Sequence, residues 1–283
     1  MNTKKRLLAL ISLPSVWLLI FFIIPFSMMA LFSFRDNSFG PLFPPTLKHY
    51  QAFFASKNYL RMLADSSWIA FLTALISILL AYPLAYFLIF RGGKHRLMLL
   101  SLLIIPAWTS YLLRILAWKV MLGSGGIINS ILIQLGWITE RIPLILYSRS
   151  AVIITLVYIW IPYAALPIFS SLERIEPHLL DASSDLGANP WRTFFNVTLP
   201  LSIPGIAAAF FFVFIPTLGE WVTPALVGGV DGIMYGNLIQ NQFLRGLNWP
   251  LGIVMSLVLM VIVSIFTILL YRFISIRDMS SIA

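Results

Sequence analysis

The sequence predicts an all-α integral membrane protein with six transmembrane helices. Hydrophobic residues occupy 60% of the 283 positions and charged residues only 10%, whereas about 25% of a soluble domain is charged. Six apolar runs are each long enough to cross the hydrocarbon core, which takes about 20 residues. The predicted spans are residues 7–34, 68–90, 97–118, 151–170, 203–222 and 251–271.

The first apolar run follows Lys4, Lys5 and Arg6, as the apolar core of a signal peptide would. The run is too long for such a core, and no Ala-x-Ala cleavage site follows it. We therefore expect residues 1–6 to form a short cytoplasmic N-terminus and residues 7–283 to form a single transmembrane domain.

The distribution of basic residues predicts the orientation of the spans. If the N-terminus is cytoplasmic, Lys and Arg are about twice as dense in the inside segments as in the outside ones. The short inside loop 91–96 carries Arg91, Lys94 and Arg96, and the positive-inside rule is strongest for short loops. Both termini and the polar segment 171–202 are therefore expected in the cytoplasm.

The polar segment 171–202 reads as two short helices joined by a tight turn. Pro177 can open the first helix, because the first helical position needs no backbone N–H partner. Gly187 stands where a helix ends in a left-handed residue, a conformation that glycine adopts without a Cβ clash. Asn189 and Pro190 then form an N-cap and first helical position, which predicts a second helix over 191–198.

The spacing within this segment resembles the EAA loop of ABC importer permeases. The matching positions are Asp181, Ala182, Ser183, Gly187, Val197, Leu199 and Pro200, with Asp for Glu, Ser for the second Ala and Val for Ile. In that family the loop docks on a cytoplasmic ATPase and transmits its motion. The resemblance implies that the ATPase-coupling residues are Asp181, Ala182, Ser183, Asp185, Leu186, Gly187, Leu199 and Pro200.

Two further stretches are similar to the spermidine/putrescine permease family. One is 106–118 with Gly126 and Asn129, and the other runs from 219–229 to Asn248-Trp249-Pro250. The likeness covers roughly residues 60–272. It implies a type I importer fold in a bacterial inner membrane, a second homologous permease, and an extracytoplasmic binding protein that delivers polyamine. It also implies a dimer of cytoplasmic ATPase subunits, which would bind ATP and Mg.

Arg114 and Glu220 are the charged residues expected inside spans, where charge is costly and often functional. Each is residue 18 of its run when counted from the cytoplasmic end, so both are expected near the outer mouth. They could pair and help to close a gate, or Glu220 could offer its carboxylate to a cationic substrate beside aromatic rings. Alternatively, both could extend to the interface as ordinary snorkelling residues. The aromatic candidates are Trp108, Tyr111, Tyr158 and Trp221.

The remaining polar residues do not form the pattern of a metal site, a phosphate loop or a catalytic site. It has no cysteine, and His49, His95 and His178 fall in different segments and cannot form one metal site. The segment 92–94 lacks the upstream glycine and the following Ser or Thr of a phosphate loop. We therefore expect no enzyme activity, metal or cofactor here. The net charge of +9 does not indicate nucleic-acid binding, because no soluble basic face is expected.

Three alternatives to polyamine import remain open. The same permease type also serves aminophosphonates, opine-like compounds and other amino-acid-derived solutes. An ion-coupled secondary carrier would normally place ionisable groups near the bilayer midplane, where the predicted spans have none. An integral membrane enzyme would need clustered His, Asp or Glu at one surface, and the sequence shows no such cluster.

Overall fold

The computed structural model describes residues 11–12, 14–140 and 146–280, and all regular secondary structure in them is helical. The predicted N-terminus, residues 1–6, lies outside the described residues. The chain divides into two compact units, Met1–Arg61 with Leu238–Ile262, and Met62–Asn237 with Val263–Ala283. Six described helical segments are long and apolar enough to cross a membrane: Pro14–Phe32, Lys57–Phe90, Tyr111–Gln134, Arg149–Glu173, Pro190–Leu218 and Trp249–Ile268. The predicted all-α class with six spans is thereby confirmed.

The first unit joins the N-terminal segment to the chain around Trp249. Its elements are η1 (Leu19–Ile23), α2 (Ile24–Phe32), α3 (Lys48–Ala55), most of α12 (Tyr235–Leu244) and the first part of α13 (Trp249–Ser280). The Trp249 backbone N–H donates to Ser38 Oγ at 2.8 Å, and the Trp249 ring lies 5.9 Å from that of Phe39. Phe53 on α3 is fully buried and stacks on Tyr59 at 5.9 Å.

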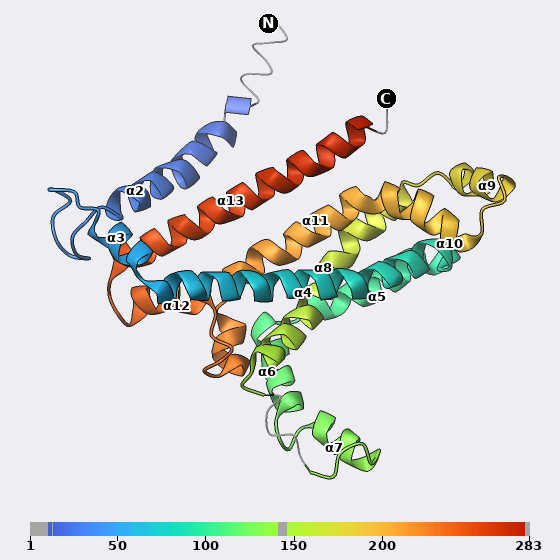
Figure 1. Ribbon diagram of the computed structural model, residues 1–283, viewed down its shortest axis with the longest axis horizontal. Coiled ribbons are helices and arrows are strands. Elements are labelled where there is room, and N and C mark those ends of the chain that lie inside the picture. Colours follow the sequence, from blue (N-terminus) through green and yellow to red (C-terminus); the bar gives the residue numbers. More distant parts are fainter. Residues whose placement is uncertain (1–10, 13, 141–145, 281–283) are drawn as a thin grey trace, which may run out of the picture. The chain divides into compact units, whose positions relative to one another are not determined.

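The second unit holds most of the remaining helices (Figure 1). In chain order they are α4 (Lys57–Phe90), η2 (Gly93–His95), α5 (Arg96–Ile104), η3 (Ile105–Trp108), α6 (Tyr111–Leu122), α7 (Ile127–Gln134), α8 (Arg149–Glu173), α9 (Pro177–Asp185), α10 (Pro190–Thr193), η4 (Phe194–Thr198), α11 (Leu199–Leu218) and η5 (Pro224–Gly228). Its core forms where α4, α6 and α8 meet the chain after α11, around the buried side chains of Ile69, Ile115, Leu156 and Met234.

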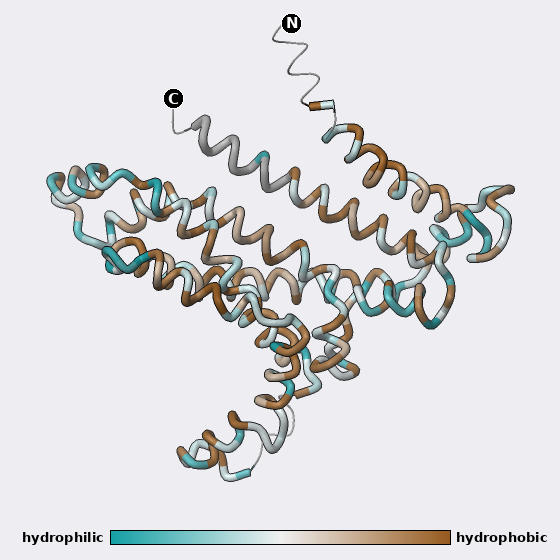
Figure 2. The backbone as a smooth tube through the Cα atoms, turned by 180° about the vertical axis from the view of Figure 1, so that it is seen from behind, coloured by the Kyte–Doolittle hydropathy of each residue, from teal (hydrophilic) through white to brown (hydrophobic). Residues whose placement is uncertain are grey.

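Helix α4 packs through a face of small residues. These side chains are fully buried and recur about every four positions, at Ser66, Ala70, Thr73, Ala74, Ser77, Ala81 and Ala85. Small residues let helices approach closely, and close packing holds membrane helices together where lipid removes the hydrophobic driving force. Larger apolar side chains such as Leu79 and Phe87 stay exposed on α4, as expected of a surface that meets lipid or another subunit. Figure 2 shows the hydrophobic colouring that runs along the long helices.

Helices α8 and α11 lie side by side and make the most extensive helix pair among the described residues (Figure 1). Gly205 on α11 permits this approach. A Cβ atom at this position would meet the Cβ of Ser171 on α8 and would lie 2.6 Å from the carbonyl oxygen of Pro167. Glycine is required here for space, and its φ angle is not in the left-handed region.

Three of the predicted spans differ from the observed helices. The predicted second span, 68–90, begins earlier, because α4 starts at Lys57. The predicted third span, 97–118, is not one helix: it breaks after η3, where Thr109 adopts an extended conformation with ψ 157° and Ser110 has ψ 130°. The helical segment that qualifies as a span there is Tyr111–Gln134. The predicted fifth span, 203–222, ends at Leu218 and begins earlier, because α10, η4 and α11 follow one another without a break from Pro190. The second predicted loop helix, 191–198, is the first part of that run.

Gly205→Val should destabilise the fold, because three extra carbons cannot enter the contact between α8 and α11. Overpacking of this kind costs about 1–3 kcal/mol. The matched control is Gly125→Val, since a Cβ at Gly125 meets no atom within 4 Å. Heating the detergent-solubilised protein and measuring the monodisperse fraction by size exclusion should give a lower midpoint for the Gly205 variant only. Equal midpoints would contradict the close-packing assignment.

Candidate functional site

The first candidate site is the helix–turn–helix formed by α9 and the start of the Pro190–Leu218 run. Gly187 has a φ of +76°, the left-handed conformation expected from the sequence. The turn is closed by backbone hydrogen bonds from Gly187 N–H to the Ser184 carbonyl at 2.9 Å and from Ala188 N–H to the Ser183 carbonyl at 3.1 Å. These bonds satisfy carbonyls that a helix end leaves open.

Side chains fix the second helix to the first. Asn189 Oδ1 accepts a hydrogen bond from the Arg192 backbone N–H at 2.8 Å, so Asn189 is the N-cap, and Pro190 follows in the first turn. The Ser183 and Thr193 hydroxyls lie 2.9 Å apart and hydrogen-bond across the turn. The helix–turn–helix is therefore held by its own contacts.

The surface of this segment is exposed and combines large apolar side chains with polar ones. Leu186 is 89% exposed and Trp191 is 72% exposed, and Asp181, Ala182 and Asp185 are exposed on α9. Large exposed apolar groups rimmed by polar ones mark interaction surfaces. Not all predicted coupling residues lie on this surface. Ser183 is half-buried by its bond to Thr193, and Leu199 and Pro200 are half-buried in the first turn of α11.

An aromatic contact joins this segment to α4. The Phe194 ring meets the edges of the Tyr82 and Tyr86 rings, each with a centroid distance of 5.9 Å. The Tyr82 hydroxyl also lies 2.9 Å from Ser202 Oγ on α11. Sequence reasoning missed Phe194, Tyr82, Tyr86 and Ser202. The available signal was the spacing of Tyr82 and Tyr86, which places both rings on one face of a helix.

The second candidate site surrounds Glu220, which lies beyond the end of α11 and not inside a helix. Its Oε1 accepts hydrogen bonds from the backbone N–H groups of Val222 at 2.8 Å and Thr223 at 3.1 Å. Its Oε2 accepts from the Tyr111 hydroxyl on α6 at 2.6 Å. Glu220 therefore caps the helical turn that leads into η5, where exposed N–H groups favour a negative charge, and it ties that turn to α6.

Arg114 is placed near this network but does not pair directly with Glu220. The ion pairs among the described residues do not include the two, and the Arg114 Cζ atom lies 5.8 Å from the centroid of the Tyr111 ring. Tyr111 thus contacts both charges. A direct ion pair, one of the sequence hypotheses, is absent from this conformation.

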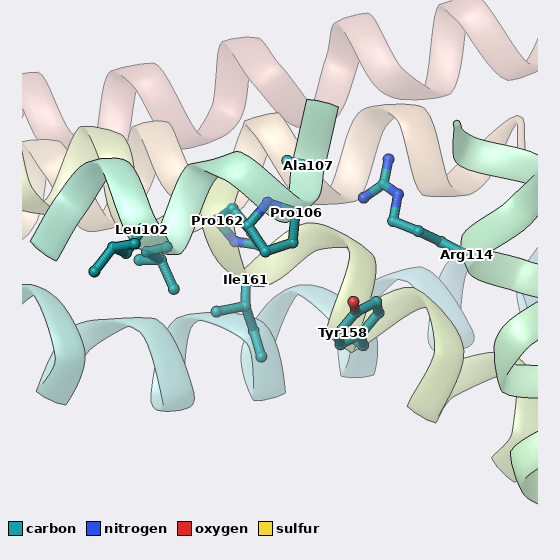
Figure 3. A pocket seen from close by; sticks show the side chains of 8 residues that line it. Leu102, Pro106, Ala107, Arg114, Tyr158, Ile161 and Pro162 are labelled. Atoms are coloured by element: carbon teal, nitrogen blue, oxygen red, sulfur yellow. The ribbon is translucent and has the colours of Figure 1, made fainter. Parts of the chain in front are cut away.

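The other aromatic candidates are not gathered around Glu220. Trp108 is 84% exposed at the end of η3, and Trp221 is 43% exposed. Tyr158 on α8 packs on Trp118 with a centroid distance of 5.3 Å and lines a different hollow together with Arg114. Figure 3 shows this cavity, about 220 Å³ in volume, between α5, η3, α6 and α8.

No group of three His, Cys, Asp or Glu side chains suited to a metal ion occurs in the part of the chain that the structure describes. His49 is bonded to the backbone oxygen of Asp36 at 3.0 Å, and His178 lies 3.2 Å from Glu176 on the exposed loop. These histidines have local partners in separate places.

Comparison with known families assigns the chain. A family model described as "Binding-protein-dependent transport system inner membrane component" matches residues 7–277. The chain belongs to this family. It is therefore a multi-pass inner-membrane permease component of an ABC transporter, a transport subunit without a catalytic domain and without a cofactor of its own. Membership implies an ATPase, a second permease and a binding protein as partners.

Curated relatives include spermidine/putrescine permeases. The chain is 37% identical over 258 residues to the "Spermidine/putrescine transport system permease protein PotB" of Haemophilus influenzae, covering 90% of each chain. It is 36% identical to PotB of Escherichia coli K12, covering 90% of this chain and 93% of that protein. It is also 31% identical to the "Inner membrane ABC transporter permease protein YdcU" of E. coli K12, with 83% and 78% coverage.

Solved structures show the same fold. A bacterial ABC transporter that imports the acidic polysaccharide alginate matches with a TM-score of 0.72, at 17% identity, over 96% of each chain. The same transporter bound to its alginate pentasaccharide-loaded periplasmic protein matches with a TM-score of 0.71 over 94% of this permease. The likeness confirms the predicted importer-permease fold.

Tyr111→Phe should lower stability, because it removes the hydroxyl that binds the Glu220 carboxylate. A hydrogen bond to a charged group in a membrane protein contributes about 1–2 kcal/mol. Tyr163→Phe is the control, since no hydrogen bond of its hydroxyl occurs among the described residues. In a double-mutant cycle with Glu220→Gln, the shifts in thermal midpoint should be less than additive. Full additivity would show that the two residues act independently.

Proposed function

We propose that this permease is a subunit of an ATP-driven importer of polyamines, spermidine or putrescine. The observation that carries the proposal is the 36–37% identity to spermidine/putrescine permeases over about 90% of both chains. The chain would form the translocation pathway together with a second homologous permease. Lipid would cover the exposed apolar faces of its spans.

The segment 173–200 is proposed to couple this permease to the ATPase. Its exposed Leu186 and Trp191 would enter a groove on the partner, with the carboxylates of Asp181 and Asp185 facing basic groups there. Two ATPase subunits, which bind ATP and Mg, would sit below the two permeases. An extracytoplasmic binding protein would deliver the polyamine. This arrangement requires both termini and the coupling segment to be cytoplasmic, as the basic-residue distribution favours.

Movement of the coupling segment would reach the spans by two routes. Pro190–Leu218 is an uninterrupted helical run, so a displacement of its first turn is passed directly to α11. Phe194 presses on Tyr82 and Tyr86, so the same displacement is also passed to α4. Leu199 and Pro200 would act within this run and not as contact residues.

Gly187→Val should uncouple transport from ATP hydrolysis. A left-handed non-glycine residue costs about 1–2 kcal/mol, and relief of that strain would reorient α9 relative to α10. Gly136→Val is a matched control, because Gly136 has a similar φ of +72° and open space around it but lies in a different loop. In reconstituted vesicles, polyamine uptake per ATP hydrolysed should fall for the Gly187 variant and stay unchanged for the control. Normal coupling in both variants would contradict the assignment.

In the pathway, Glu220 with Tyr111 and Trp221 is proposed as the group that a polyamine meets near the outer mouth, and Trp108 and Tyr158 as further aromatic surface. Cation–π contact and a carboxylate both suit an ammonium ion. Glu220 is partly exposed, although its oxygens already accept three hydrogen bonds. A polyamine would therefore compete with Tyr111 for this carboxylate.

A small solute with an anionic group, such as an aminophosphonate or an opine-like compound, is the second candidate substrate. The observation that favours it is the distribution of charge: the Glu220 carboxylate is hydrogen-bonded within the chain, whereas the Arg114 guanidinium borders a cavity. A guanidinium that borders a cavity and has no ion-pair partner among the described residues suits an oxyanion better than it suits a polyamine.

The ATPase activity of the assembled complex distinguishes the two candidates. Binding protein loaded with spermidine, putrescine or an aminophosphonate is added to complex in vesicles, with unloaded binding protein as the control. Polyamine import predicts stimulation by one or both polyamines and none by the phosphonate. Stimulation by the phosphonate alone would remove the polyamine assignment and keep the importer.

A further inference from the structure

The Arg114 guanidinium is a buried charge with no ion-pair partner among the residues that the structure describes. The residue is only 9% exposed, and its Nε atom is shielded from solvent with no hydrogen-bond partner. No side-chain hydrogen bond or ion pair of Arg114 occurs among the described residues, and the Tyr111 ring is the group that faces its charge. Removing a charge from water costs several kcal/mol unless an opposite charge and hydrogen bonds compensate.

Arg114 borders two neighbouring hollows in the second unit. One, of about 220 Å³, is otherwise lined by apolar residues of α5, η3 and α8 together with Tyr158. The other, of about 540 Å³, is lined by Arg114, Tyr158, Thr109 and apolar residues of α6. Figure 3 shows Arg114 and Tyr158 at the same end of the first cavity, reaching it from α6 and α8. The Tyr158 hydroxyl likewise has no hydrogen bond among the described residues.

We propose that Arg114 and Tyr158 form a binding site for an oxyanion, a carboxylate or a phosphonate. The planar guanidinium offers paired N–H donors that match two oxygens of such a group. The Tyr158 hydroxyl supplies a further donor, and the apolar lining strengthens the ion pair by lowering the local dielectric. The Glu220 carboxylate is not the oxyanion that binds Arg114, because its oxygens accept hydrogen bonds from Tyr111, Val222 and Thr223.

This inference rests on the proposed function only in that the chain lines the pathway of an importer. The oxyanion has two possible sources, an acidic side chain of the second permease or an anionic group of the solute in transit. A polyamine carries no oxyanion, so polyamine import requires the first source. Import of an aminophosphonate allows the second.

The test compares Arg114→Gln, Arg114→Lys and Tyr158→Phe with the control Lys119→Gln. Lys119 lies further along α6 and faces the Tyr147 ring, so its variant loses the same charge from the same helix outside both hollows. The complete complex in vesicles is supplied with binding protein and either putrescine or 2-aminoethylphosphonate, and initial uptake is measured. Co-purification of both permeases and the ATPase confirms assembly of each variant.

Arg114→Gln should reduce uptake at least about tenfold, as expected when one side of a buried, hydrogen-bonded charge pair is removed. Arg114→Lys should retain part of the activity, because it keeps the positive charge but loses the paired N–H donors of the guanidinium. Tyr158→Phe should cause a smaller loss, and Lys119→Gln should stay within about twofold of wild type, since Lys119 is only half-buried and lines neither hollow. Wild-type uptake by an assembled Arg114→Gln complex would overturn the proposal.

The source of the oxyanion follows from two further measurements. If the wild type imports putrescine, Asp→Asn and Glu→Gln variants of the second permease are combined with Arg114→Gln, and restored uptake identifies the protein partner. If it imports 2-aminoethylphosphonate, a raised KM for that solute in Arg114→Gln identifies the solute. A loss of uptake with neither rescue nor a KM change would also overturn the site. Absence of polyamine uptake in the wild type would remove the polyamine assignment alone.

Discussion

The close contact of α8 and α11 is the constraint on which the rest of the second unit depends. Gly205 lets α11 approach the backbone of α8 at Pro167, and both helices lead directly to the helix–turn–helix, α8 into α9 and α11 from α10. The two helices therefore form one packed pair with the helix–turn–helix at one end. At the other end, α11 stops at Leu218 and the chain turns at Gly219 into the Glu220 network. A displacement of the helix–turn–helix thus has a packed route to the hydrogen bonds of Glu220, because packed cores shift between discrete arrangements and do not deform continuously.

Polar groups in this permease are satisfied by short-range backbone geometry where possible and by distant side chains where not. Glu220 illustrates both, since it caps the backbone N–H groups of Val222 and Thr223 and also accepts from Tyr111, 109 positions earlier. Ser66 similarly accepts from the Tyr235 backbone N–H at 2.7 Å, and Asn237 donates to the Trp221 carbonyl at 2.7 Å. An apolar medium penalises every unpaired group. The irregular chain between α11 and α12 is therefore held by side chains from α4 and α6.

The difference between contacts made within a few residues and contacts made by distant side chains explains how far the sequence predicts the structure. Composition and the length of apolar runs predict an all-α membrane fold, because the bilayer sets the length of a span and requires its backbone groups to be hydrogen-bonded internally. The turn at Gly187 and the cap at Asn189 are predictable because each acts within a few residues. The break at Thr109 is not predicted, because the run 97–118 is apolar over most of its length and the small polar residues Thr109 and Ser110 also occur within continuous spans. The partners of Glu220 could not be predicted, because capping needs a helix start that the apolar run 203–222 conceals, and Tyr111 comes from another helix. The direct pairing of Arg114 with Glu220 is wrong for this conformation for the same reason: equal depth along two spans does not fix which faces meet.

Glu220 and Arg114, which were expected to act together, differ in their hydrogen bonding, and this difference affects which substrate suits the permease. Glu220 is hydrogen-bonded within the chain, so its carboxylate serves a structural purpose before any ligand arrives. Arg114 is buried beside open volume with an aromatic ring as its described neighbour. In a low-dielectric setting an unpaired guanidinium raises the energy of any nearby ammonium ion by Coulomb repulsion. A permease that passes polyamines must therefore neutralise Arg114 before the substrate reaches it, and an acidic side chain from the second permease is the group able to do so at all times. If no such side chain faces Arg114, the electrostatics of the proposed site favour a solute that brings its own negative charge.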